Sequence, residues 1–410
     1  MKIKEVNIKE LKGFKDFKLS FEKEDKVLDL VVLVGSNGTG KTTLLEAIKD
    51  FFENKYVNYS EPEKSNVDLK ILLNNSEKNS KAIAENKNNG YERHLWEFFN
   101  VLSNYKYYQN NHLGIYENLL AKNLENLPKI IYLPTRTNFN NVNTRSNTLP
   151  KRNAFINIVD SNVFDDIPSY IATRKNYLAN TNDNMTMKEI NENLSNEINN
   201  IFKILDLDVR FIGLSKDETS TPIFTNSSGI EFDINALSSG EKQLFLRTLS
   251  IKMLEPEDSI ILIDEPEISL HPKWQQRIIE VYKKIGKNNQ IIIATHSPHI
   301  LGSVDKESVF LLSKDERGNI ISKTGDELYD TYGQPTDRIL QDIMGLTSVR
   351  TPKIEEELNS LRLLIDEDKY ETDEFKEKFQ RLSKILGETD NDLFLIDMDV
   401  KLKQKVKANA

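Results

Sequence analysis

Residues 35–42, GSNGTGKT, have the composition and spacing of a loop that binds phosphate groups. The segment fits G-x-x-x-x-G-K-[ST] and lies between an apolar, β-branched run at 28–34 and a helix-like run at 42–52. Glycines let backbone N–H groups surround phosphates, and a helix N-terminus adds positive potential. Lys41 is expected to reach the β- and γ-phosphates of ATP, and Thr42 to hold Mg²⁺. The residues expected to bind the nucleotide here are Gly35, Ser36, Asn37, Gly38, Thr39, Gly40, Lys41, Thr42 and Thr43.

Two further apolar runs end in residues suited to phosphate chemistry. SIILIDE ends in Asp264 and Glu265, and QIIIATHS ends in Thr295 and His296. Asp264 is suited to hold Mg²⁺, Glu265 to polarise the attacking water, and His296 to donate to the γ-phosphate. Alone, these residues also fit a solvated acidic turn and a structural histidine. Because open parallel sheets bind ligands at the carboxyl ends of their strands, the catalytic interpretation is favoured beside a phosphate loop, with Lys41, Glu265 and His296 as catalytic residues.

The segment LSSGEKQ predicts a second helix start that can hold a phosphate. Ser238 precedes Glu241 by three residues, which is the spacing of a capping box. An ordinary capped helix accounts for these two residues but not for Gly240 in the first turn, where a better helix former is expected. A glycine and two hydroxyl groups let an anion approach free N–H groups. Within one chain the segment duplicates residues 35–42, so we expect Ser238, Ser239 and Gly240 to contact the ATP of a second copy.

The order of these motifs resembles the ABC-type ATPases of the soluble, SMC-like branch, over about residues 1–50 and 128–312. The resemblance implies an α/β fold, a P-loop ATPase head with an antiparallel β subdomain, a helical lobe and a C-terminal helical hairpin. It also implies Mg²⁺-dependent ATP hydrolysis, a homodimer or higher oligomer, and 269–271 at the dimer seam. In that family a basic residue near the N-terminal strands often reaches the nucleotide, so Lys15, or Lys12, is a further nucleotide-binding candidate.

Two features depart from that family. The glutamine that joins the core to the helical lobe is not evident, and Gln109 and Arg136 are equal candidates for its role. No long heptad coiled coil separates the two halves, which excludes a full-length chromosome-organising member. DMD at 397–399 is reminiscent of a nuclease acidic pair, but the dozen residues that follow are too few for that fold.

The C-terminal sequence resembles the ATPase subunits of bacterial anti-phage systems, the PtuA subunits of Septu and the ATPases found beside retrons. YGQPTDRILQDIMGL and the acidic helical hairpin at 353–386 carry this resemblance. It implies regulation of a partner nuclease of the HNH type, with the hairpin as docking element or simply packed on its own core. The predicted apolar stripes of the hairpin are Ile354, Leu358, Leu361 and Ile365, then Phe375, Phe379, Leu382 and Ile385.

Composition limits the remaining classes. A charged content of 29%, apolar runs no longer than a strand and the absence of cysteine favour a cytoplasmic protein without a membrane segment. The net charge of −9 argues against a globally basic surface but leaves a local DNA-binding groove open. DNA is therefore a further candidate partner, and a repair or recombination ATPase of the RecF-like type is the alternative function. A transporter subunit is disfavoured by the missing glutamine.

Five segments are expected from these patterns. They are the N-terminal half of the ATPase core at 1–52, a polar, low-complexity helical insertion at 53–127, a strand with the helical lobe at 128–210, the C-terminal half of the core at 211–325, and the C-terminal hairpin at 326–410.

Overall fold

The computed structural model describes residues 1–52, 66–73, 76–78, 128–135, 156–217, 219–387 and 389–409. Most of the expected insertion, including Gln109, and also Arg136, lie outside the described residues. The chain divides into two compact units, Met1–Ile339 and Leu340–Ala410. Residues 326–339 therefore belong with the ATPase core rather than with the C-terminal helices.

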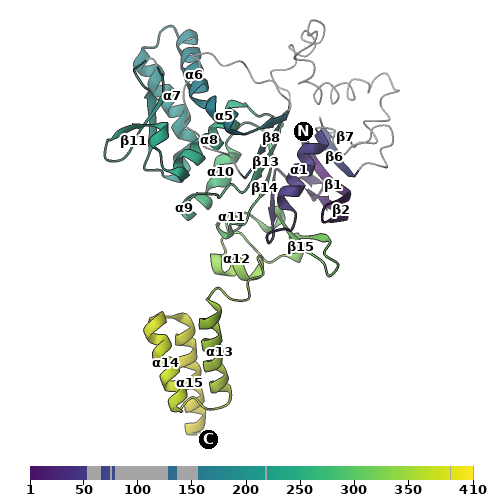
Figure 1. Ribbon diagram of the computed structural model, residues 1–410, viewed down its shortest axis with the longest axis vertical. Coiled ribbons are helices and arrows are strands. Elements are labelled where there is room, and N and C mark those ends of the chain that lie inside the picture. The colour runs from purple at the N-terminus through teal and green to yellow at the C-terminus, as the bar shows by residue number, and fades with distance from the viewer. Residues whose placement is uncertain are drawn as a thin grey trace. The chain divides into compact units, whose positions relative to one another are not determined.

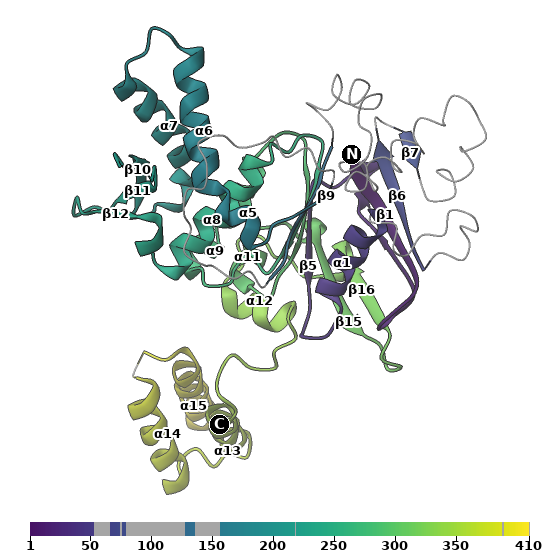
Figure 2. The same cartoon turned by 45° about the horizontal axis from the view of Figure 1, so that its top comes forward.

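A seven-stranded sheet forms the centre of the first unit (Figure 2). Its order is β16-β15-β5-β14-β13-β8-β9, and all neighbours are parallel except β16, which pairs antiparallel to β15. The strands are β5 (Leu30–Val34), β8 (Ile130–Leu133), β9 (Ile156–Ile158), β13 (Ile260–Asp264), β14 (Gln290–Ala294), β15 (Val309–Lys314) and β16 (Ile320–Thr324). Every residue of β5, β13 and β14 is buried, because both faces of the sheet are covered, which explains their uninterrupted apolar sequences.

One face of this sheet packs against a helix and an antiparallel sheet. The core there joins alternate residues of β5, β13 and β14 to helix α1 (Lys41–Phe52) and to β1, β2 and β6. In Figure 2, α1, β1 and β6 lie on one side of β5, and α8 and α9 lie on the other. The antiparallel sheet has the order β2-β1-β6-β7, with β1 (Lys2–Leu11), β2 (Phe14–Ser20), β6 (Val67–Leu73) and β7 (Ser76–Lys78), and β3 (Glu22–Lys23) pairs with β4 (Lys26–Val27).

The helical lobe packs on helix α8 (Ser239–Met253). Its ring contacts are Phe202 to Phe245, with centroids 4.2 Å apart, and Phe224 to Phe245, at 4.9 Å. The lobe contains α5 (Ser161–Asp165), α6 (Ile167–Thr181), α7 (Met187–Phe202) and the antiparallel strands β10 (Arg210–Leu214), β11 (Pro222–Thr225) and β12 (Glu231–Asp233). The remaining helices of this unit are the short α9 (Pro272–Gln275), α10 (Ile278–Lys283) and α11 (Pro298–Leu301), while α12 (Thr336–Asp342) crosses the unit boundary. Helix α8 thus contacts the lobe through Phe245 and the central sheet through Arg247, which donates to the carbonyl oxygen of Asp264.

The second unit is a bundle of three helices, α13 (Pro352–Asp366), α14 (Asp373–Leu386) and α15 (Asn391–Asn409) (Figure 1). The first two form the predicted hairpin, and α15 adds a third helix that was not predicted. Its Leu393 and Ile396 complete the buried core of the bundle. The expectation that Ile385 belongs to this core is wrong, because Ile385 is 59% exposed and Leu386 continues the apolar stripe of α14 instead.

Candidate nucleotide-binding site

The loop at 35–42, hereafter the P-loop, joins β5 to α1. Three of its residues, Gly35, Gly38 and Gly40, have positive φ angles of 153°, 78° and 88°. A side chain at Gly40 would lie 2.6 Å from Ile320 Cδ1 and 2.7 Å from Phe14 Cζ. Backbone conformation and close packing therefore both require glycine at Gly40, which brings the main chain of the loop into the wrapped form that phosphates need.

Lys41 is held at the inner side of this loop. Its Nζ donates hydrogen bonds to the carbonyl oxygens of Gly35, at 2.8 Å, and Ser36, at 3.1 Å. Burial lowers the pKa of the Lys41 ammonium, and the neighbouring carboxylates of Glu265 and Asp264 oppose that shift. The structure thus gathers a buried cation and two acidic side chains at one end of the sheet.

Asp264 ends β13 beside the first turn of α1. Its Oδ2 accepts hydrogen bonds from the hydroxyl groups of Thr42, at 2.9 Å, and Thr135, at 2.5 Å. Its Oδ1 is buried without a hydrogen-bond partner in the described part of the chain. A hydroxyl group and a buried carboxylate with an unpaired oxygen are suitable ligands for Mg²⁺, which usually keeps most of its water. The side chains of Thr42 and Asp264 therefore fit this ion.

Glu265 and His296 face each other at the ends of β13 and β14. The Nε2 of His296 lies 3.7 Å from Oε1 of Glu265, and both side chains are about 30% exposed. Glu265 has a φ of 45°, and its backbone N–H donates to the carbonyl oxygen of Ala294 at 2.8 Å. Burial and then the charge of Lys41 lower the pKa of His296, while Glu265 opposes them. Both effects disfavour the protonated form of the imidazole.

Glu267 and Arg247, like Thr135, belong to this site and were missed from the sequence. Glu267, for which no role was predicted, accepts hydrogen bonds from the Thr295 hydroxyl and the His296 backbone N–H. Arg247 is 2% exposed in α8 and donates from Nη2 to the backbone carbonyl of Asp264 at 2.9 Å. A single arginine within the apolar run LFLRTLS was the signal that could have identified it.

The start of α8 is capped as predicted. The Ser238 hydroxyl accepts from the Glu241 backbone N–H, and the Glu241 carboxylate accepts from the Ser238 backbone N–H at 3.0 Å. Ser238 and Ser239 are exposed. Gly240 has a reason within its own chain, because a Cβ atom there would lie 2.5 Å from the Ser269 carbonyl oxygen. The inference that Gly240 is explained only by an approaching anion is therefore wrong.

Two lysines near the N-terminal strands, Lys12 and Lys15, were candidates for contacting the nucleotide. The Nζ of Lys12 is 3.5 Å from Thr43 Oγ1 and 3.6 Å from Glu46 Oε2. Lys15 is exposed on β2, opposite Glu10, and its nucleotide-binding role remains a prediction. Of these two candidates, Lys12 is the one that the structure brings next to the P-loop helix.

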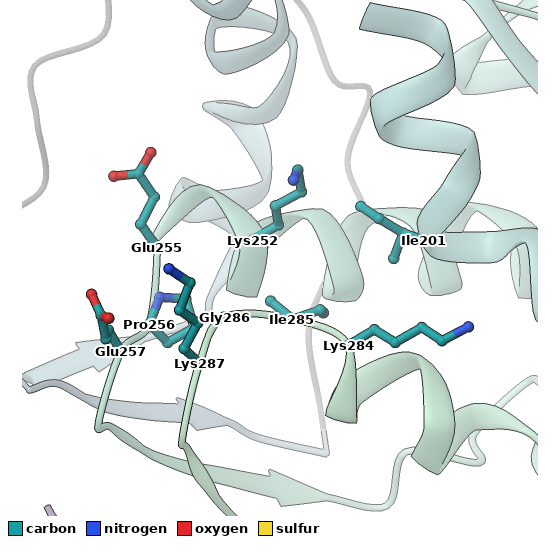
Figure 3. Close-up of a pocket in the computed structure, with 9 residues that line it drawn as sticks. All are labelled: Ile201, Lys252, Glu255, Pro256, Glu257, Lys284, Ile285, Gly286 and Lys287. Atoms are coloured by element: carbon teal, nitrogen blue, oxygen red, sulfur yellow. The ribbon is translucent and has the colours of Figure 1, made fainter.

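A cavity of about 250 Å³ lies at the amino ends of the strands of the central sheet (Figure 3). Pro256 and Glu257 precede β13 and Gly286 and Lys287 precede β14, so they line it from the amino ends of the strands. Lys284 points away from the glutamates in Figure 3, and Lys252 forms an ion pair with Glu197 at 3.2 Å. Because the P-loop, Asp264 and His296 follow the carboxyl ends, this cavity is separate from the nucleotide-binding residues.

The parallel sheet, the P-loop, the acidic strand end and the capped helix α8 are those of an ATPase of the ABC type. The chain belongs to the family described as AAA domain, putative AbiEii toxin, Type IV TA system, whose model matches residues 30–302. It is an enzyme that hydrolyses ATP, and it resembles PtuA.

Similar proteins include a Septu protein and a retron ATPase. The Septu protein PtuA of Bacillus thuringiensis is 26% identical over 387 residues, which cover 90% of each chain. The Retron Ec83 probable ATPase of Escherichia coli is 25% identical over 210 residues, 47% of this chain and 36% of that protein. The SMC head domain from Thermotoga maritima is 14% identical with a TM-score of 0.40, and covers 80% of this chain and 100% of that one. This chain thus matches PtuA over nearly its full length but only about a third of the retron ATPase.

None of the helices in the described part of the chain carries an apolar run long enough to span a bilayer.

Proposed function

We propose that two copies of this chain bind ATP between them, each P-loop being completed by Ser238, Ser239 and Gly240 of the other copy. The exposure of both serines at the N-terminus of a fifteen-residue helix supports this proposal. Their capping interactions are satisfied locally, and among the described residues no hydrogen bond joins them to the P-loop of their own chain. The positive end of α8 is thus available to a phosphate from outside.

In the proposed reaction, the P-loop backbone binds the phosphates and Lys41 neutralises charge on the β- and γ-phosphates. Glu265 accepts a proton from the attacking water, and neutral His296 donates a hydrogen bond to the γ-phosphate. Thr42 and Asp264 would hold Mg²⁺, which supplies charge neutralisation when bound. The observation that carries this assignment is the 3.7 Å separation of Glu265 and His296 beside the P-loop lysine.

Mixing two inactive variants tests the shared site. K41A removes the phosphate-binding lysine. S239E places a carboxylate at the start of α8, where it stabilises the helix but repels the other copy's phosphates. Each variant alone is expected to be inactive, whereas an equal mixture should recover about a quarter of the wild-type rate, because half of the dimers contain one intact site.

The matched control is S227E, which adds the same charge at the exposed turn after β11. It should leave hydrolysis unchanged. If S239E keeps the wild-type rate, or if the mixture stays inactive while S239E still binds ATP, completion of the site by a second copy is excluded.

We further propose that this ATPase regulates a partner nuclease of the HNH type in anti-phage defence. Similarity to the Septu protein PtuA over 90% of both chains supports this, as does similarity to retron ATPases. A docking surface is available on α15, where apolar side chains are exposed along one side of the helix. Those side chains, here called the α15 stripe, are Phe394, Leu395, Met398, Leu402 and Val406, which are 42–69% exposed.

Purification from the native host tests the partner. We expect a small nuclease to copurify with the wild-type chain and with Q404D, an exposed control on the same helix, but not with F394D/L402D. Retention of the nuclease by F394D/L402D would exclude the α15 stripe as its docking surface. A homodimer that copurifies with no nuclease and hydrolyses ATP faster in the presence of DNA would instead support the repair alternative. Similarity to the DNA double-strand break repair Rad50 ATPase of Sulfolobus acidocaldarius, 28% identical over 153 residues, favours that alternative.

A further inference from the structure

We propose that Glu267 is a positioning residue of this ATPase: its carboxylate fixes the main chain at Thr295 and His296 and so holds the imidazole beside Glu265. The proposal deepens the proposed mechanism, because it rests on the roles given there to Glu265 and His296. Glu267 itself is given no contact with ATP and no proton to transfer.

One carboxylate oxygen makes both contacts. Oε1 of Glu267 accepts from the Thr295 hydroxyl at 2.8 Å and from the His296 backbone N–H at 2.6 Å. The Thr295 oxygen accepts in turn from the Ser297 backbone N–H at 2.9 Å. The whole turn that carries His296 is therefore tied to the loop after β13 by a charge-assisted hydrogen bond to a backbone group.

The C-terminal side of that turn is held independently. Ser297 caps α11 by accepting from the Ile300 N–H, and its hydroxyl donates to Gln275 Oε1 at 2.7 Å. Loss of Glu267 would thus free the His296 backbone N–H and the Thr295 hydroxyl, while the Thr295 backbone N–H stays bonded to the Leu33 carbonyl oxygen at 3.0 Å and the helix that follows keeps its cap. The predicted consequence is local: the imidazole moves relative to Glu265 while the P-loop stays in place.

Burial of the Glu267 carboxylate is unfavourable for the stability of the folded protein. Its Oε2 is buried without a hydrogen-bond partner in the described part of the chain, and burial raises the pKa of the Glu267 carboxyl despite the bonds to His296 and Thr295. A buried acidic group with an unpaired oxygen is a poor stabilising element. Its contribution is better explained by the geometry that it imposes on the turn at His296.

The loop after β13 carries Glu265 and contacts both the turn at His296 and the start of α8. Glu265 lies two residues before Glu267, and Ser269, two residues after it, packs against Gly240 at the start of α8. Glu267 therefore connects the main chain that carries the base with the main chain that carries His296. This connection adds to the pairing of the two strands, in which the Glu265 N–H donates to the Ala294 carbonyl oxygen, and it extends that pairing to His296, whose Nε2 lies 3.7 Å from Glu265.

Substitution distinguishes positioning from proton transfer. In E267Q the amide oxygen still accepts both hydrogen bonds, so we expect kcat within about threefold of wild type. In E267A both bonds are lost, and displacement of His296 should lower kcat by about 100-fold. Affinity for a non-hydrolysable ATP analogue should be unchanged in both variants, because neither alters the P-loop.

The position of His296 is measured independently of hydrolysis. In protein labelled with ¹³C-histidine, with the His296 resonance assigned by H296Q, the imidazole of wild type and E267Q should titrate below the ordinary pKa of about 6.5. In E267A its pKa should rise toward that value as the ring leaves its partly buried place near Lys41. Should E267A not fold, T295V removes the hydroxyl group at nearly constant volume, and with it both the bond to Glu267 and the acceptor of the Ser297 N–H, while the His296 N–H keeps its bond to Glu267. An intermediate shift is expected.

Two outcomes would overturn the proposal. If His296 titrates in E267A as it does in wild type, Glu267 does not position His296; T295V gives the same test if E267A does not fold. E267Q as inactive as E265Q means that the Glu267 carboxylate takes part in the chemistry. A shifted titration together with full activity of H296Q would refute the mechanism proposed for His296 while the positioning of His296 by Glu267 stands.

Discussion

The first turn of α8 and the loop after Asp264 meet within one chain: a Cβ atom at Gly240 would lie 2.5 Å from the carbonyl oxygen of Ser269. The neighbour is a backbone atom, which cannot move aside as a flexible side chain does. Both segments are expected at the seam between two copies of this ATPase. Their contact makes them one surface, so a nucleotide that touches Ser238 or Ser239 also meets a fixed arrangement of the loop at 269–271.

G240A is expected to destabilise the protein, although alanine favours helices over glycine by about 1 kcal/mol. Overpacking against a backbone carbonyl costs about 1–3 kcal/mol, which offsets or exceeds that gain. Chemical denaturation should give a lower free energy of unfolding for G240A and slower ATP hydrolysis. S239A, at the neighbouring exposed position, should differ from wild type by less than about 0.5 kcal/mol. A G240A protein more stable than wild type would contradict the close contact with Ser269.

T42A is expected to weaken the effect of Mg²⁺ on nucleotide binding. It removes a proposed metal ligand and also the hydrogen bond to Asp264, which keeps Thr135 as a partner. Titration of ATP by calorimetry, with Mg²⁺ and with EDTA, should show a smaller difference in Kd for T42A than for wild type. T43A is the control for metal binding: Thr43 is a nucleotide-binding candidate but not a metal ligand, so the Mg²⁺ dependence of its Kd should match wild type even if the Kd itself changes. Equal Mg²⁺ dependence in T42A and wild type would exclude Thr42 as a ligand.

R247M is expected to lower kcat without lowering stability. Arg247 is fully buried, has no ion pair among the described residues, and leaves Nε and Nη1 without hydrogen bonds. Replacing a buried charged group by an apolar one of similar length often leaves stability equal or higher. R247M nevertheless lacks the hydrogen bond from Arg247 to the Asp264 carbonyl oxygen. We expect this bond to position the side chains of Asp264 and Glu265. R247A, which also leaves a cavity, should lose about 2–5 kcal/mol of unfolding free energy. Full activity of R247M would show that this hydrogen bond is dispensable.

Stability is expected to fall in mildly acidic solution because of His296. Its pKa in the folded protein is lowered from 6.5, so between the folded and unfolded values the unfolded chain binds more protons. The free energy of unfolding therefore rises with pH across this window and is lost as pH falls from about 6.5 through the folded pKa. Urea denaturation at pH 7.5 and 5.5 should show a larger loss for wild type than for H296Q. Equal losses would mean that His296 has an ordinary pKa.

Local patterns predicted the parts of the site that depend on neighbouring residues. The buried strands β5, β13 and β14 are recognisable because they are apolar throughout, and the P-loop because glycine spacing is a backbone requirement. The capping box of Ser238 and Glu241 is likewise local, since its partners are three residues apart.

What was missed depends on segments that are distant in sequence. Gly240 meets Ser269, Glu267 meets Thr295, and Arg247 meets Asp264 only because folding brings two segments together. The helix α15 was missed for another reason: NDLFLIDMDVKLKQKVKAN has apolar residues on its buried side and on the exposed α15 stripe, so no single apolar face marks it.

An ATP site shared between two copies is tested most directly by the mass of E265Q in solution with and without ATP and Mg²⁺. Loss of the base should trap the nucleotide, so sedimentation velocity is predicted to show twice the mass per particle when ATP and Mg²⁺ are present. The double variant K41A/E265Q should not respond, because its P-loop lacks the phosphate-binding lysine. An E265Q protein that binds ATP tightly at an unchanged mass would contradict an ATP site shared between two copies.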